Sequence, residues 1–350
     1  MRKHIVILSL VLCCLCFVCC GSGYLQSKEN AAEADQEAVL QETNYVIATC
    51  TNEKCIVLYD LDTYDGENLD NCEIWYFAPE IPENYQSGGI SGVKYREDTI
   101  FGDVVILCAG NGYAAIISYP DGKVLWEVFD SGENAHAIEI LPSGNVAVAA
   151  SNGSTLRVFA SCAVLQNDAE AAFTYREYPL KGGHGVLWDP EYEVLWALGS
   201  TQLQAYTIAG EGKDETLAFR ADLGCEKQSL DGHDLSADFS DSDYLWVTGK
   251  DHVFRFEKET GELLTAYDFC DKLDKPYIKG FGNNPSGSYF QTMPNYGMGT
   301  SWEKESYAGW STDRIYFYHM NEDKTDLETI KCKSNTRAFY KVFSFYGKYQ

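Results

Sequence analysis

The feature of this sequence that most constrains its fold is a short motif that recurs at a nearly constant spacing. An apolar strand pattern begins at a histidine three times, at His136, His184 and His233, with spacings of 48 and 49 residues. In the first two copies a proline follows six positions after the histidine, and a second apolar run begins at the tenth position. A regular repeat of this length is typical of folds that use one supersecondary unit several times.

The residues between the histidines are typical of short β-strands. Runs of β-forming residues alternate with turns of Gly, Asn, Asp and Ser, and no long stretch has helical periodicity. This pattern is found in sandwiches, barrels and propellers. A period of about 45 residues accommodates four strands and their turns, which make up one propeller blade. The sequence therefore predicts an all-β propeller whose complete blades begin near residues 90, 136, 184, 233 and 277.

The two ends of the folded region form one further blade when they are combined. Three strands are expected at 45–48, 56–61 and 72–77 without an innermost partner, and a single strand is expected at 338–346. We therefore predict a six-bladed β-propeller closed by strand exchange between the N- and C-termini. Such closure removes exposed sheet edges, which favour aggregation. A seventh blade would need about 45 more residues.

The first 20 residues are typical of a signal peptide. A basic start is followed by an apolar run that ends at Cys20 and is short for a stable membrane span. The end of this run resembles a bacterial lipobox, so we expect Cys20 to carry a lipid, with plain secretion as the alternative. Residues 21–43 are rich in Ala, Glu and Gln and predict an acidic tether. The domains are then 1–20, 21–43 and the propeller at 44–350, exported as an envelope lipoprotein or secreted.

The charge of the chain limits its partners. It carries 52 acidic and 27 basic residues, a formal net charge of -25. The negative electrostatic field of such a chain argues against binding of nucleic acid and of an anionic membrane surface. Membrane contact is therefore expected only through the N-terminal lipid. We expect a monomer. Outside the leader the cysteines have no metal-binding spacing; Cys50 and Cys55 flank one turn, and a disulfide or two buried thiols both fit.

The histidines begin strands that line the central channel of a propeller, and equivalent positions can be sought in the other blades. Counting six positions back from Pro285, as from the prolines of the repeat, gives Lys279. Counting ten positions back from Val104, as from the second apolar run of the repeat, gives Lys94. The closing strand carries Arg337 and Lys341 near the equivalent place. The predicted ring at the channel mouth therefore consists of basic or potentially basic residues in an acidic protein. A slip of one residue would turn any of these side chains away from the channel.

Three interpretations of this ring remain open. Cationic side chains at the mouth of a low-dielectric cleft attract carboxylate, sulfate or phosphate groups. Neutral imidazoles from consecutive blades could instead coordinate a divalent metal through His136, His184 and His233, although flanking lysines would repel the cation. In the third interpretation each histidine only holds neighbouring blades together.

A long loop in the sixth blade adds an aromatic element. Residues 294–312 contain Trp302 and Trp310 among Gly, Ser and Glu, and the loop is expected on the same rim as the histidines. Exposed tryptophans in a long loop typically cover or bind something. We expect these two side chains either to contact a sugar or aromatic ligand or to fold down as additional core.

The chain resembles a group of bacterial exported β-propeller proteins known only as a domain of unknown function. The matching segments are AHAIE at 135–139, GHGVLWD at 183–189 and RAFYKV at 337–342. The resemblance implies the propeller fold rather than an activity. Histidine-lined propellers are also similar to some polysaccharide lyases that act on uronic acids, which is an analogy at the level of fold.

These observations lead to one functional hypothesis and one alternative. The protein is expected to bind an anionic carbohydrate at the channel mouth, with Lys94, Lys279, Arg337, Lys341, Trp302 and Trp310 as ligand-binding residues. If it is an enzyme, a basic residue would neutralise a uronate carboxylate while His136, His184 or His233 abstracts the adjacent proton. The alternative is a non-enzymatic protein-interaction scaffold of the cell envelope, in which the histidines are structural.

Overall fold

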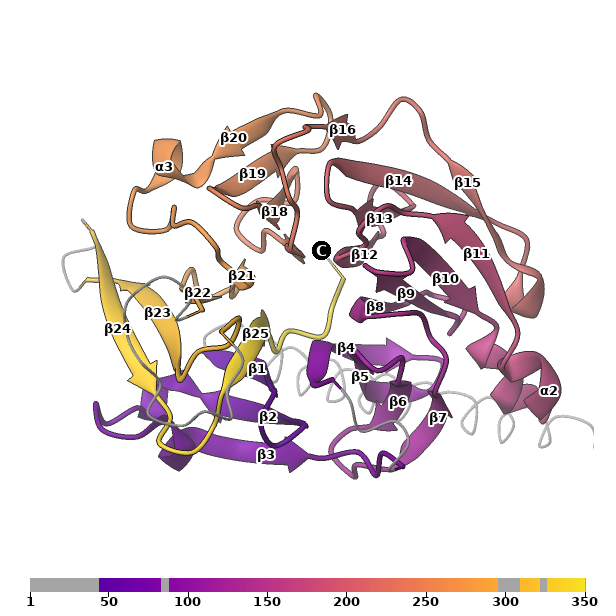
Figure 1. The fold of residues 1–350 in the computed structure, drawn as a ribbon, viewed down its shortest axis with the longest axis horizontal. Coiled ribbons are helices and arrows are strands. Elements are labelled where there is room, and N and C mark those ends of the chain that lie inside the picture. The colour runs from indigo at the N-terminus through magenta and orange to yellow at the C-terminus, as the bar shows by residue number, and fades with distance from the viewer. Residues whose placement is uncertain (1–43, 83–87, 295–308, 322–325, 350) are drawn as a thin grey trace, which may run out of the picture. The chain divides into compact units, whose positions relative to one another are not determined.

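The computed structural model describes residues 44–82, 88–294, 309–321 and 326–349, and Figure 1 shows their arrangement. Six antiparallel sheets surround a central axis, with one strand of each sheet lining that axis. No helix of the described residues is both long and apolar enough to cross a membrane. The predicted signal peptide, Cys20 and the acidic tether lie outside the described residues.

The five complete blades follow one another along the chain, each running from the inner to the outer strand. Blade two consists of β4 (Ile90–Thr99), β5 (Gly102–Ala109), β6 (Ala114–Ser118) and β7 (Val124–Val128). Blade three consists of β8 (Ala135–Ile140), β9 (Val146–Ala150), β10 (Thr155–Phe159) and β11 (Tyr175–Pro179). Blade four consists of β12 (Gly185–Asp189), β13 (Val194–Leu198), β14 (Gln202–Ala209) and β15 (Thr216–Phe219), with β16 (Cys225–Glu226) beside β14.

The remaining complete blades have shorter inner strands. Blade five consists of β17 (Asp234–Ala237), β18 (Tyr244–Thr248), β19 (Val253–Glu257) and β20 (Leu263–Thr265), and blade six consists of β21 (Gly280–Asn283), β22 (Tyr289–Thr292), β23 (Arg314–Met320) and β24 (Leu327–Lys333). The described helices are short and connect strands: η1 (Leu61–Thr63), η2 (Leu69–Cys72), η4 (Ser161–Gln166), α2 (Ala169–Ala172), η5 (Gly212–Asp214) and α3 (Ala266–Phe269).

The ring closes by strand exchange, as predicted. Blade one has the order β25 (Phe339–Ser344), β1 (Tyr45–Cys50), β2 (Cys55–Asp60) and β3 (Glu73–Phe77), so the last strand of the chain is the innermost strand of the first blade. An arginine next to β25 strengthens this junction. The Arg337 guanidinium lies 2.7 Å from Glu73 and 3.2 Å from Glu53, on the N-terminal side of the blade.

The hydrophobic core lies between adjacent blades. Trp196 of blade four packs edge-on against Phe256 of blade five at 5.5 Å, and Trp246 of blade five packs against Phe281 of blade six at 5.0 Å. Both tryptophans are buried, so they fill the space between the blades. Such aromatic pairs contribute about 0.5–1.5 kcal/mol beyond their buried area.

Charged side chains rather than apolar ones fill the channel just below its entrance. Lys341 of β25 is fully buried, and its ammonium lies 3.0 Å from Asp234 of β17. It also donates to the main-chain carbonyls of His136 and His184, at 3.4 and 3.2 Å. One side chain therefore connects the inner strands of blades one, three, four and five.

A second ionic layer lies deeper in the channel. Lys94 and Arg96 of β4 bind the fully buried carboxylate of Glu139, at 2.9 and 2.8 Å. The Lys94 ammonium also donates to the carbonyl of Val186. Burial raises the pKa of Glu139, but Arg96 and Lys94 outweigh this effect and hold it below its ordinary value.

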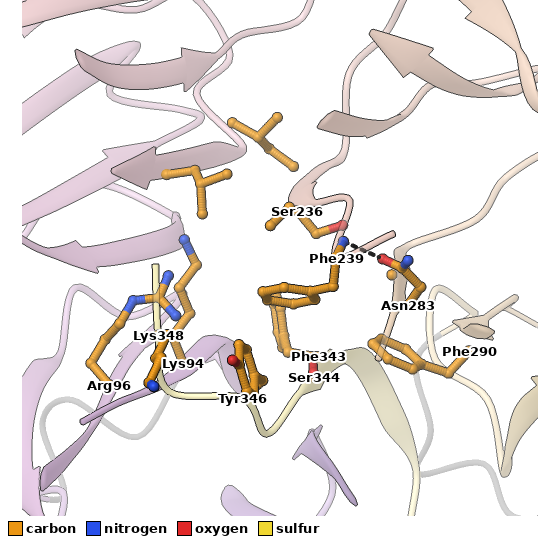
Figure 2. Close-up of a pocket in the computed structure, with 14 residues that line it drawn as sticks. Lys94, Arg96, Ser236, Phe239, Asn283, Phe290, Phe343, Ser344, Tyr346 and Lys348 are labelled. Atoms are coloured by element: carbon orange, nitrogen blue, oxygen red, sulfur yellow. Dashed lines mark hydrogen bonds between the residues drawn. The ribbon is translucent and has the colours of Figure 1, made fainter. Parts of the chain in front are cut away.

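The C-terminal residues close the opposite end of the channel, and Figure 1 shows them running from β25 to the centre of the ring. Phe345 stacks on Tyr95 at 4.1 Å, and the Tyr349 hydroxyl donates to the carbonyl of Ile140 at 2.6 Å. A small pocket of about 40 Å³ lies there, and Figure 2 shows Phe239 and Tyr346 among its lining residues. The channel is therefore blocked at this end.

Replacing Lys341 should test the importance of the first ionic layer. In Lys341→Ala the carboxylate of Asp234 is left buried without its partner, which should lower the free energy of unfolding by about 3–5 kcal/mol. The double variant Lys341→Met/Asp234→Asn removes both charges and should recover at least half of that loss. Urea unfolding followed by tryptophan fluorescence measures both.

The exposed pair Arg220 and Asp222 supplies the matched control. Arg220→Ala removes an ion pair of 2.7 Å at the surface and should leave the urea midpoint unchanged. An unchanged midpoint for Lys341→Ala would contradict the role of the axial lysine.

Candidate ligand-binding mouth of the channel

The inner strands of the blades begin at the same end of the channel, because each blade repeats the same topology. His184 donates its main-chain N–H to Leu198, His233 to Thr248, and Lys279 to Thr292, at 2.8, 2.9 and 3.0 Å. These three hydrogen bonds are equivalent, because in each blade the donor is the residue immediately before the inner strand. Lys279 therefore occupies the position of a histidine, as the repeat predicted.

In blades one, two and three the residue at the mouth of the channel lies in a β-bulge. His136 is the unpaired residue between the pairs Ala135↔Ala150 and Ala137↔Ala149. Ser91 has the same place between Ile90↔Ala109 and Gly92↔Cys108, and the irregularity in β25 follows Phe339↔Cys50, at Tyr340. Bulges commonly redirect a side chain near a functional site. The residues at the mouth are Ser91, His136, His184, His233, Lys279 and Tyr340.

Three of the residues predicted for this ring lie elsewhere, and the expected register was wrong for them. Lys94 corresponds to Glu139 of blade three rather than to His136. Because β4 has ten residues, Val104 of β5, from which the count was made, lies three positions farther along the chain than the repeat requires. Lys341 lies one layer below the mouth and pairs with Asp234. Arg337 binds Glu53 and Glu73 at the edge of blade one.

The three histidine rings are in direct contact with one another. His136 and His184 are stacked, with ring centroids 4.3 Å apart and an interplanar angle of 27°. His184 and His233 meet edge to face at 5.2 Å and 73°. All three side chains are half-buried, so the cluster retains access to solvent.

Hydrogen bonds define which nitrogen atoms are available. His184 donates from Nδ1 to the carbonyl of Gly182 at 2.9 Å, which leaves its Nε2 with a free lone pair. Nδ1 of His136 lies 3.2 Å from the hydroxyl of Tyr340. Nδ1 of His233 is buried and has no hydrogen-bond partner among the described residues.

The surroundings keep the imidazoles neutral near pH 7. Burial, His184 and Lys341 lower the pKa of His136 well below its ordinary value. Burial and Lys341 lower the pKa of His184 to about 4, and burial together with Lys279 lowers that of His233 to about 2. A neutral imidazole can donate and accept hydrogen bonds, and an anion beside it would favour its protonation.

Lys279 is the cation of the mouth itself. Burial and Lys341 lower its pKa to about 8, and Asp231 opposes this shift. Among the residues that the structure describes, no carboxylate lies within ion-pair distance of its ammonium. Asp231 lies at 3.9 Å from Nε2 of His233 instead. Lys279 therefore adds a positive charge beside neutral imidazoles, in a protein of net charge -25.

The ring geometry does not suit coordination of one metal ion by the three histidines. In stacked imidazoles the nitrogen lone pairs lie in nearly parallel ring planes and do not point at a common atom. Within the described ranges no group of three or more His, Cys, Asp or Glu side chains is arranged to hold a metal ion.

A cleft of about 420 Å³ opens beside the histidines. His136, Lys279, Tyr340 and Trp310 form its wall near the axis. The remaining lining residues come from blades one, two and three: Thr51, Gly88, Gly89, Ile90, Ser91, Gly110 and Asn134. The volume lies in the range of small-molecule sites.

One of the two predicted loop tryptophans lines this cleft. The side chain of Trp310 is 52% exposed, whereas the indoles in the blades are buried or half-buried. Trp302 lies outside the described residues. Sequence reasoning missed Ser91 and Tyr340, because a bulge shifts the side chain that would otherwise be assigned by counting.

Comparison with solved structures shows the fold. A protein of unknown function from Bacteroides caccae is 11% identical, with 85% of this chain and 97% of that chain covered and a TM-score of 0.51. A provisionally assigned 6-phosphogluconolactonase from Bacteroides uniformis ATCC 8492 is 10% identical, with coverages of 86% and 99% and a TM-score of 0.51. At these identities the likeness extends to the propeller fold alone.

Sequence comparison identifies the family, which confirms the resemblance to a group of unknown function. No curated protein matches the chain. Residues 2–302 match the family of unknown function DUF6528, and because this match covers most of the chain, the protein belongs to that family.

Proposed function

We propose that this protein is an exported, lipid-anchored propeller that binds an anionic carbohydrate at the mouth of its channel. The observation that carries the proposal is the cluster of three half-buried histidines beside Lys279, next to a cleft with an exposed tryptophan. Such a site offers charge and hydrogen-bond donors on one side and an aromatic face on the other.

The charge distribution supports an anion rather than a neutral ligand. Lys279 and the buried Lys341 place positive potential at the mouth, and the desolvation that lowers the pKa of Lys279 would be relieved by a bound carboxylate. An anion in the cleft would also accept hydrogen bonds from the Lys279 ammonium and from a ring N–H of His136, both of which line it. Binding in a partly buried site strengthens each of these interactions.

The aromatic wall supports a sugar as the body of the ligand. Trp310 and Tyr340 line the cleft next to His136, and apolar ring faces are suitable surfaces for a pyranose. A uronic acid combines such a ring with one carboxylate. It therefore fits both sides of the site.

The same geometry suits a β-elimination at a uronate. Lys279, which lines the cleft, would neutralise the carboxylate. Nε2 of His184, whose ring stacks on the lining residue His136, would take the proton from the adjacent carbon. The electrons of that C–H bond would form the carbon–carbon double bond as the neighbouring glycosidic C–O bond breaks. The leaving oxygen would receive a proton from the hydroxyl of Tyr340, which would regain one through His136.

Variants of the mouth should separate ligand binding from folding. The triple variant His136→Ala/His184→Ala/His233→Ala should weaken binding of galacturonate at least tenfold, and Lys279→Ala should do so by a similar factor, because each loses charge-assisted hydrogen bonds. Isothermal titration calorimetry measures both.

His319→Ala is the matched histidine control, because His319 packs on Phe317 in blade six. Its affinity for galacturonate should stay within twofold of the wild type. Unchanged binding by the folded triple variant would contradict the proposal, and retention of one envelope protein in its place would support the scaffold alternative.

The affinity for the anion should fall as the pH rises from 5 to 9. The free imidazoles are neutral, with pKa values of about 4 and about 2 for His184 and His233, and a bound anion raises both, so binding takes up protons at low pH. Above about pH 8 Lys279 loses its charge. Calorimetry in two buffers of different ionisation enthalpy counts the protons, and release of protons at pH 5 would contradict the mechanism.

The lipid anchor has a direct test. When the full chain is produced in a bacterial host with an alkyne-labelled fatty acid, the wild type should incorporate the label, and Cys20→Ser should not. The neighbouring variant Cys19→Ser should remain labelled. Equal labelling of the two variants would overturn the assignment of Cys20.

A further inference from the structure

As far as the described residues line it, the cleft at the mouth extends to one side of the axis. Its lining residues come from blades six, one, two and three. Thr51 and Gly110 follow the second strands of blades one and two, so they lie farther from the axis than the residues of the inner strands. Within the described part of the chain no residue of blade four or five lines it. His184 and His233, which pack against each other in those blades, are not among its lining residues.

The channel below the mouth offers no second exit. The Lys341–Asp234 pair lies directly under the histidines, and the Lys94–Glu139–Arg96 layer lies beneath it. The side chains of both layers are 9% exposed or less. Residues 345–349 then cover the far end. A chain molecule therefore cannot thread through the propeller.

We propose that the mouth binds the end of an anionic glycan rather than an internal segment, with the terminal acidic sugar at the axis and the rest of the chain leaving over blades one and two. This inference rests on the proposed function and specifies its substrate class. An internal segment would need open space on both sides of Lys279 and His136. The cleft provides it on one side.

The walls of the cleft fit this direction. Gly88, Gly89 and Gly110 have no side chains, so this part of the cleft leaves room for further sugar units. Gly88 has a φ of +95°, a conformation that other residues rarely adopt, so a larger residue there would be strained. Thr51 and Asn134 supply polar groups along this path.

The number of protein molecules bound per glycan chain distinguishes the two modes. Titration of the full-length protein with galacturonate, trigalacturonate and a defined oligogalacturonate of about fifteen units should give one protein per chain at every length. Several proteins per long chain would overturn end binding while leaving the proposed function intact. Absence of binding at every length would overturn the proposed function and this inference together.

A paired substitution tests the direction of the chain. Thr51→Trp narrows the outer part of the cleft in blade one, so it should weaken trigalacturonate binding at least tenfold and leave galacturonate binding within twofold. Lys250→Trp places the same side chain in the corresponding turn of blade five, where Lys250 is exposed, and should change neither. Equal effects of the two variants on trigalacturonate would overturn the inference.

Discussion

The buried ammonium of Lys341 is the interaction on which the rest of the ring depends. It belongs to β25, the strand that closes the propeller, and it reaches Asp234 and the carbonyls of His136 and His184 on other blades. Asp234 in turn accepts from the main-chain N–H of Phe281 in blade six at 3.2 Å. A buried charge is stable only when its hydrogen bonds are satisfied, so these strands must meet at one point of the axis.

The same ammonium sets the electrostatics of the mouth above it. Lys341 contributes to the lowered pKa of each histidine and of Lys279. Protonation of one imidazole would add a further positive charge to a partly desolvated cluster. The histidines therefore remain neutral donors and acceptors until an anion supplies the opposing charge. Burial is the largest cause of these lowered pKa values and Lys341 adds to it, so the strand that closes the fold also contributes to the properties of the site.

The sequence allowed the fold to be predicted almost completely, and the site only in part. The spacing of His136, His184 and His233 defined the blades, since every blade repeats the same order of four antiparallel strands. Lys279 follows the same register and was identified correctly. Lys94 was misplaced because the hairpin after β4 is longer, and Tyr340 was missed because a bulge precedes it. Loop lengths and bulges depend on local packing between blades, and the spacing of the repeated sequence motif contains no information about that packing.

The contrast between the layers of the channel favours a ligand at the mouth. In the deeper layer Lys94 and Arg96 share the carboxylate of Glu139, and each charge has a partner. A fold that needed only structural contacts at the mouth would be expected to pair its polar groups equally well. Instead, among the described residues, Lys279 has no carboxylate partner and Nδ1 of His233 has no hydrogen bond. The partly desolvated ammonium of Lys279 at the open end of the channel costs stability, and binding of an anion there would offset that cost.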